Sequence, residues 1–207
     1  MRRIGRITAI SLGALALSAC ASQRGELASS PAMSQAQPQS QAPAQGIDLL
    51  FETYDQRQLE LSPLSKAYRG IRGDDYGDWG DFSDAGEIAQ QKLLQATAAA
   101  MRANYSPGAL PADDALSYRL FDAMAKRSAE TFPFREYGYL FDQMNGAQSD
   151  LPAFLINIHS VADASQAEDY VERIGGLGPV LDTLIAESRE RVGRGVMPPK
   201  WVYAYVI

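Results

Sequence analysis

Residues Asp84–Tyr105 read DAGEIAQQKLLQATAAAMRANY and predict one long helix. Apolar residues recur along the stretch at three- and four-residue spacing, which marks one helix face: Leu94, Ala98, Met101 and Tyr105. Asp84 and Glu87 have the spacing of a capping box at the start of the helix, with Asp replacing the usual Ser or Thr. Pro107, Gly108 and Pro111 then break the periodicity, so a turn follows.

Helical spacing extends on both sides of this stretch. Residues 47–61 predict a helix that Ser62-Pro63 ends, and residues 112–131 predict another whose apolar stripe is Leu116, Leu120 and Met124, widened by Phe121. A short helix is expected over 150–158, with Pro152 in its first turn. Ser165 and Glu168 form a second capping box before a helix that Gly175-Gly176 stops. A further helix is expected over 177–191, with Gly193 as its terminator.

The resulting fold class is all-α, an irregular helical array over residues 47–207. No strand alternation is sustained in the sequence, and there is no internal repeat and no heptad run long enough for a coiled coil. Pro198-Pro199 looks like a helix start, yet the sequence ends eight residues later at Ile207 without a polar turn or a terminating Gly. We therefore expect an incomplete part of a larger helical fold. The alternative is a terminal segment that tucks into the core.

The N-terminus has the pattern of an export signal. Three arginines, Arg2, Arg3 and Arg6, precede an apolar run too short to span a bilayer. Leu17-Ser18-Ala19-Cys20 looks like a lipobox, so residues 1–19 are expected to be removed as a lipoprotein signal peptide. Cys20, the only cysteine, would then carry the lipid. The alternative is an ordinary signal peptide with a chance cysteine.

Location and tethering follow from the residues after this cysteine. Ala21, in place of the aspartate that often retains lipoproteins in the inner membrane of Gram-negative bacteria, points to the outer membrane, facing the periplasm. Residues 20–46 are rich in Ser, Gln, Ala and Pro and hold no aromatic residue, so they predict a flexible linker. The lipid is the only membrane attachment we expect.

Charge excludes one class of partner. The chain has 19 basic and 25 acidic residues, and its formal charge falls from −6 to −9 without the three arginines of the signal peptide. An acidic chain without a basic cluster is a poor candidate for binding nucleic acid.

No catalytic or metal site can be assembled from the residues present. His159 is the only histidine, so a zinc site with two or three histidines cannot form, and we interpret His159 as structural. Residues 74–84 hold five aspartates that could bind calcium, although their spacing does not match an EF-hand. The interleaved Tyr76, Trp79 and Phe82 favour a loop that packs down with its acids in water. We expect no cofactor in this chain.

Several motifs together resemble a known bacterial family. They occur in this order: Leu49-Leu50-Phe51-Glu52 leading to Ser62-Pro63, the acidic loop ending in Phe82-Ser83-Asp84, Asn145-Gly146-Ala147-Gln148-Ser149-Asp150-Leu151-Pro152, Ala167-Glu168-Asp169-Tyr170, and Arg194-Gly195-Val196-Met197-Pro198-Pro199. The set is similar to the N-terminal region of the domain of unknown function 885 family and would cover about residues 47–207.

The resemblance implies a part of a peptidase-like protein. Members of that family are much longer, largely helical and often exported lipoproteins, and they look like zinc metallopeptidases of the His-Glu-x-x-x-His-His type. That motif lies downstream of any residue present, so none of its ligands maps here. The first hypothesis is therefore a non-catalytic helical region that lacks a C-terminal catalytic portion, with zinc and peptide substrate expected only in complete relatives. A standalone helical binding or scaffold lipoprotein is the second hypothesis, and an enzyme that uses His159 is the third.

Overall fold

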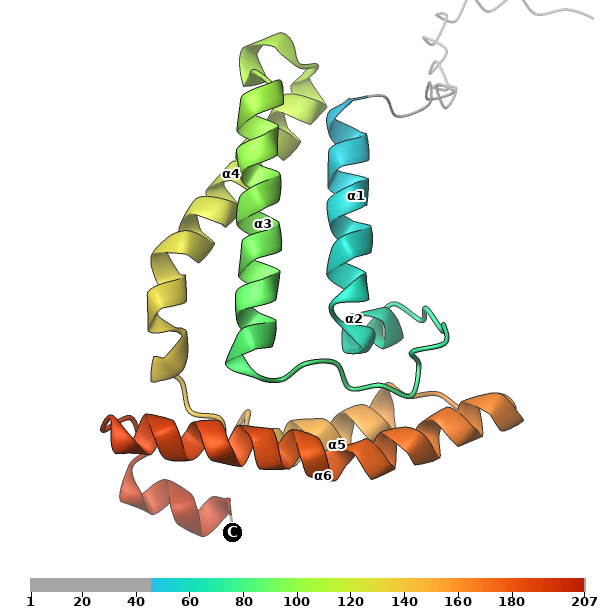
Figure 1. Cartoon of the computed structure of the whole chain (residues 1–207), viewed down its shortest axis with the longest axis vertical. Coiled ribbons are helices and arrows are strands. Elements are labelled where there is room, and N and C mark those ends of the chain that lie inside the picture. Colours follow the sequence, from blue (N-terminus) through green and yellow to red (C-terminus); the bar gives the residue numbers. More distant parts are fainter. Residues whose placement is uncertain (1–45, 207) are drawn as a thin grey trace, which may run out of the picture. The chain divides into compact units, whose positions relative to one another are not determined.

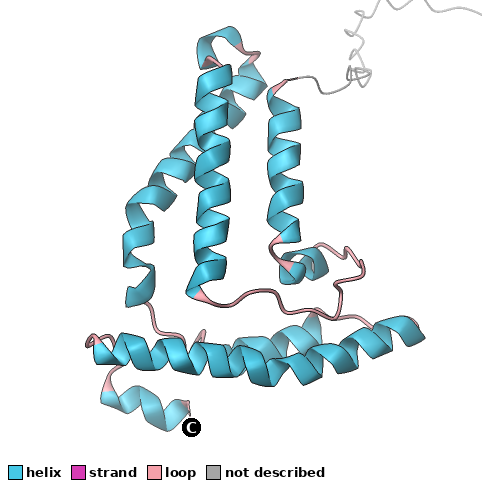
Figure 2. Cartoon of the chain, in the orientation of Figure 1, coloured by secondary structure: helices cyan, strands magenta, loops and turns pink. Residues whose placement is uncertain are grey.

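The computed structural model describes residues 46–206, and every regular element in that range is helical (Figures 1 and 2). The α-helices are α1 (Ile47–Glu60), α2 (Pro63–Tyr68), α3 (Asp84–Asn104), α4 (Ala112–Thr131), α5 (Ala147–Asn157) and α6 (Ala164–Gly193). The 3₁₀ helices are η1 (Pro107–Ala109), η2 (Phe132–Tyr137) and η3 (Lys200–Tyr205). The all-α prediction is confirmed. The predicted signal peptide, Leu17, Ser18, Ala19, Cys20 and nearly all of the linker lie outside the described residues.

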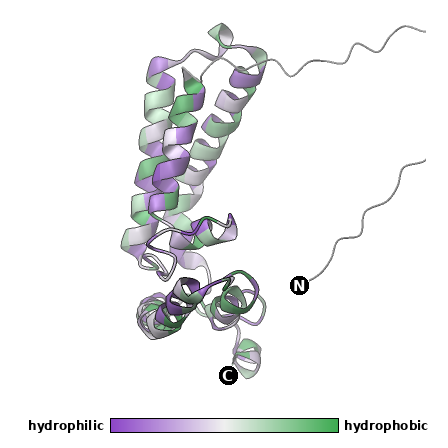
Figure 3. Ribbon diagram, turned by 90° about the vertical axis from the view of Figure 1, so that its right-hand side faces the viewer, coloured by the Kyte–Doolittle hydropathy of each residue, from purple (hydrophilic) through white to green (hydrophobic). Residues whose placement is uncertain are grey.

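Helices α1, α3 and α4 lie side by side and share one apolar core (Figure 1). Its buried residues are Ile47, Leu94, Ala98, Met101, Phe121 and Ala125. The Phe121 ring is 5.1 Å from the ring of Phe51 and 5.0 Å from that of Tyr54, centroid to centroid. Figure 3 shows that each of these helices carries both hydrophobic and hydrophilic residues, as expected when one face packs and the other meets solvent.

The predicted stripe of α4 is correct at Phe121 and wrong at its other three residues. Leu116, Leu120 and Met124 lie on the exposed side, whereas Phe121 packs inward together with two alanines, Ala115 and Ala125. Small residues on the buried face let α4 approach α3, where Ala98 is also fully buried. The spacing of the three large aliphatic residues therefore indicated the wrong face.

Two helix starts also differ from prediction. The N-cap of α3 is Ser83, whose hydroxyl accepts a hydrogen bond from the Gly86 amide, so Asp84 is the first helical residue. The N-cap of α6 is Asp163, which accepts from the Gln166 amide at 2.9 Å, so Ser165 does not cap. For α3, the shift leaves the carboxylate of Asp84 in the first turn, where the helix dipole stabilises negative charge.

A second core forms where α5, α6, α2 and the loop 69–83 meet. Its buried residues are Ala67, Tyr76, Trp79, Leu151, Phe154, Leu155, Val180 and Leu184. Contrary to prediction, α6 runs unbroken through Gly175-Gly176. A side chain at Gly176 would come within 2.9 Å of the Trp79 ring, so this glycine makes room for packing and does not end the helix.

Polar contacts connect the start of α3 to η2 and α6. Arg135 donates two hydrogen bonds to the Asp84 carboxylate, at 2.6 and 3.0 Å. The Asp84 amide donates to Glu187 at 2.7 Å. The hydrogen bond from Arg135 is the main reason that the pKa of Asp84 lies below its ordinary value. The Asp84 carboxylate thus stays charged at the point where the start of α3 meets η2 and α6.

The remaining segments differ less from expectation. α5 begins three residues earlier than predicted, and the stretch after Pro198-Pro199 forms η3, in which Val202 is buried while Trp201 and Tyr205 are exposed. Among residues 46–206, no helix combines the length and the apolar character needed to cross a membrane.

Candidate functional site

The most unusual polar centre is Arg173, which α6 carries into the second core. Its side chain is fully buried. One guanidinium nitrogen donates to the Asp78 carbonyl at 2.6 Å, and another lies 3.1 Å from Nδ1 of His159. These contacts join three segments that are distant in sequence: α6, the loop 69–83 and the short stretch after α5 that contains His159.

Aromatic rings complete the surroundings of this cation. The guanidinium carbon is 4.9 Å from the ring centre of Phe154, 5.4 Å from that of Tyr76 and 5.6 Å from that of Trp79. Within residues 46–206 no carboxylate forms an ion pair with Arg173, and its Nε has no hydrogen-bond partner. Burial lowers the pKa of the guanidinium, and cation–π attraction is strongest in such a desolvated setting. We call Arg173, His159 and these three rings the Arg173 cage.

His159, the only histidine, belongs to the cage and has both ring nitrogens engaged. Arg173 can only donate, so Nδ1 of His159 accepts, and Nε2 carries the proton toward the Gln166 carbonyl at 3.4 Å. The ring lies 4.3 Å from Tyr76 and 5.1 Å from Tyr170, centre to centre. Burial is the main reason that the pKa of His159 is lowered. A neutral, enclosed imidazole of this kind suits a structural role and not a general base.

The acidic loop folds as its aromatic residues suggested. Tyr76 and Trp79 are buried, whereas Asp74, Asp78 and Asp81 face solvent. Asp75 instead pairs with Lys66 at 2.6 Å. In the part of the chain that the structure describes, no three side chains of the metal-binding types converge. The aspartates therefore do not come together around one point.

A polar hollow with a volume of about 450 Å³ lies beside the cage. Four carboxylates line it, those of Asp81, Glu87, Asp150 and Glu187, together with the rings of Trp79, Phe82 and Tyr139. We call it the acidic hollow. Burial is the main cause that raises the pKa of Glu87. The described residues that line it offer carboxylates and aromatic rings for ion pairing and ring contacts.

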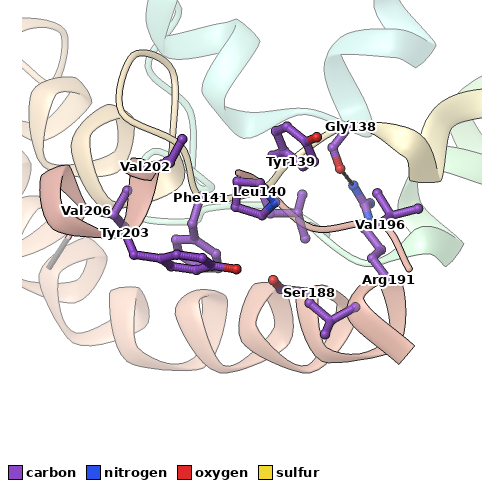
Figure 4. Close-up of a pocket in the computed structure, with 12 residues that line it drawn as sticks. Gly138, Tyr139, Leu140, Phe141, Ser188, Arg191, Val196, Val202, Tyr203 and Val206 are labelled. Carbon is purple, nitrogen blue, oxygen red and sulfur yellow. Dashed lines mark hydrogen bonds between the residues drawn. The ribbon is translucent and has the colours of Figure 1, made fainter. Parts of the chain in front are cut away.

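A smaller, mostly apolar cavity of about 180 Å³ lies between α6, residues 138–141 and η3 (Figure 4). Arg191 closes one side, donating to the Gly138 carbonyl at 3.0 Å. Tyr203 and Phe141 line the other side, and Val202 of the same segment is buried. The hydroxyl groups of Ser188 and Tyr203 are among the polar groups that the described residues contribute to this cavity.

No sequence motif singles out Arg173, although the spacing of apolar residues around it carries a signal. With Tyr170, Leu177, Val180 and Leu184 it forms a stripe at helical spacing, in which Arg173 is the one charged member. The predicted stop at Gly175-Gly176 cut that stripe in two and concealed the pattern.

Fold and site together define an all-helical protein whose buried polar centre serves structure. A family model described as bacterial protein of unknown function (DUF885) matches residues 63–207, so the chain belongs to this family. The resemblance that the motifs indicated is thereby confirmed, with a match that starts at α2. No curated protein matches the chain significantly.

Replacing the caged arginine tests how much the second core depends on it. Arg173→Ala should lower the free energy of unfolding by about 3 kcal/mol, because it empties a buried volume and leaves His159 and the Asp78 carbonyl without a donor. Arg173→Met should cost less, since it fills the space. Urea unfolding followed by circular dichroism measures both. Arg189→Ala, on the exposed side of the same helix, is the matched control and should change stability by less than about 0.5 kcal/mol.

His159 should make stability depend on pH near neutrality. Its folded-state pKa is lowered from 6.5, so the unfolded chain binds the proton first as the pH falls. The contribution of the neutral ring is fully present above pH 6.5 and is lost as the pH falls below that value. Because the chain has one histidine, its imidazole NMR signals report the pKa directly, and His159→Asn should flatten the dependence. A measured pKa above 6.5 would contradict the buried, neutral ring.

Proposed function

We propose that this chain is an exported lipoprotein whose helical part is the non-catalytic region of a metallopeptidase-like assembly. Membership of the DUF885 family supports the proposal, together with the resemblance of that family to zinc metallopeptidases. The lipobox pattern Leu17-Ser18-Ala19-Cys20 supports export and attachment to the outer membrane, facing the periplasm. In this role the helical part helps to wall a substrate cleft.

The observation that carries the non-catalytic assignment is the state of His159. A zinc site of the family type needs several histidine or carboxylate ligands around one open position. The chain has one histidine, and both of its nitrogens are engaged within the Arg173 cage. Its one cysteine is the predicted lipid attachment site. Any zinc and any hydrolysis of peptides would therefore depend on residues supplied by a catalytic portion.

The acidic hollow suits such a supporting role. Its carboxylates and rings could hold a basic or aromatic part of a peptide without attacking it. The outward-facing aspartates of the loop 74–84 add to the negative field around the same region.

A standalone binding or scaffold lipoprotein is the second candidate. It is favoured by the two apolar cores, each built from several helices, and by the bidentate pairing of Asp84 and Arg135 at their junction. A thermal melt followed by near-ultraviolet circular dichroism separates the two candidates. One cooperative transition with fixed aromatic signals supports the scaffold, whereas a molten core supports a region that needs a partner.

Material purified from membranes of cells that express the full chain tests the anchor. Mass spectrometry should find cleavage before Cys20 and acyl groups on that cysteine, and Cys20→Ser should remove the lipid and leave residues 1–19 attached. Ser18→Thr is a control, because it changes another position of the lipobox and keeps the Cys20 thiol. An uncut leader or a bare thiol in the wild-type chain would refute lipid attachment.

The same preparation tests the catalytic assignment. Zinc measured by mass spectrometry should remain far below one ion per chain, and casein and short peptides should not be cleaved. One tightly bound zinc ion per chain, with cleavage lost after chelation, would overturn the non-catalytic assignment.

A further inference from the structure

The outer face of α4 carries large apolar side chains that nothing in residues 46–206 covers. Leu116, Leu120 and Met124 expose 48%, 62% and 45% of their surface. Beside them a shallow groove of about 460 Å³ runs between α1 and α4, with Phe51 and Tyr54 on its far side. A contiguous apolar strip of this kind usually marks an interaction surface.

The residues of this face are arranged symmetrically about Leu120. Leu116 and Met124 lie four residues before and after it, and Asp113 and Arg127 lie seven residues before and after it. All five fall on one side of the helix, because steps of three and four residues return to the same face. If a second α4 lies antiparallel with Leu120 opposite Leu120, each Leu116 faces a Met124 and each Asp113 faces an Arg127.

The two charges at the ends of the pattern are available for such pairing. Asp113 and Arg127 are both exposed, and neither forms an ion pair within the described residues. By contrast Asp122, on the side of α4 toward α3, is paired with both Arg102 and Lys126. Of the unpaired charges of α4, Asp113 and Arg127 are the two that lie on the same side as Leu120, so an antiparallel copy would bring them together.

We propose that the outer face of α4 binds a second copy of this chain, with α4 antiparallel to its counterpart and the two-fold axis at Leu120. Such a contact is isologous, since the same patch serves both partners. The observation that selects a second copy over another partner is charge complementarity of the face with itself. A bilayer would not favour an acidic residue at one end of the strip, and an unrelated helix would not require the symmetry.

The chemistry of the face also sets the strength of the pairing. Burial of Leu116, Leu120 and Met124 from both copies supplies the attraction, and the groove beside α1 can receive side chains of the second α4. One pair of helices buries less area than a standard interface, so the dimer should be weak and should form in the micromolar range or above. The two Asp113–Arg127 pairs are exposed and add little affinity, but they fix direction and register.

Charge reversal tests direction and register. The full chain with Cys20→Ser, in detergent, should show concentration-dependent dimers by size-exclusion chromatography with light scattering. Arg127→Asp places two like-charged pairs in the contact and should weaken association about tenfold or more, and Asp113→Arg should do the same. The double variant Asp113→Arg/Arg127→Asp restores opposite charges and should restore association. Arg119→Asp makes the same charge change at a position about 100° around the helix from Leu120, outside the proposed contact, and should have little effect.

Single cysteines test the position of the two-fold axis. In the Cys20→Ser chain, Leu120→Cys places two thiols opposite each other at roughly 5 Å between Cα atoms, so oxidation should link two copies. Leu116→Cys should not link, because its own counterpart lies about 12 Å away along the helix axis. A chain that is monomeric at all concentrations, a double variant that does not recover, or equal linking at both positions would overturn the proposal.

Discussion

A buried guanidinium organises much of this protein. Arg173 is 0% exposed and has no carboxylate partner within residues 46–206, so neutral groups must stabilise its charge. The guanidinium is stabilised by the Asp78 carbonyl, by the imidazole of His159 and by three aromatic rings. Because these groups come from different segments, the loop 69–83 and the end of α5 have to fold onto α6 together. A buried cation left unpaired would cost several kcal/mol, so the constraint is strict.

The path of the chain beyond the cage follows from this constraint. Trp79 donates to the Arg173 carbonyl at 2.6 Å and rests against Gly176, which holds the loop along α6. A few residues later Ser83 caps α3, and Asp84 receives Arg135 from η2. The start of α3 thus follows the loop 69–83 by a local cap, and charged contacts connect the three-helix core of α1, α3 and α4 to the second core.

These features also bear on function. The only histidine of the chain is held in the cage, and among the described residues the loop aspartates belong to no cluster of three metal-binding side chains. The surfaces with the most evident capacity for contact are the acidic hollow and the outer face of α4. One is polar and lined by aromatic rings, and the other is apolar with a charge at each end.

The sequence by itself determined the helical class, the extents of α1, α3 and α4, and the family, because apolar periodicity and turn residues are local signals. It also indicated that the acidic loop packs through its aromatic residues. Only the tertiary structure decided which face of α4 is buried, that α6 continues past Gly175-Gly176, and that Arg173 occupies a core position. Each of these depends on the shape and charge of residues far away in the chain. Ala125 of α4 shares a core with Ala98 of α3, and Gly176 of α6 lies against the ring of Trp79. The spacing along α6 carries a trace of its buried stripe, but distant segments decide what each helix face packs against, so neighbouring residues alone do not settle these choices.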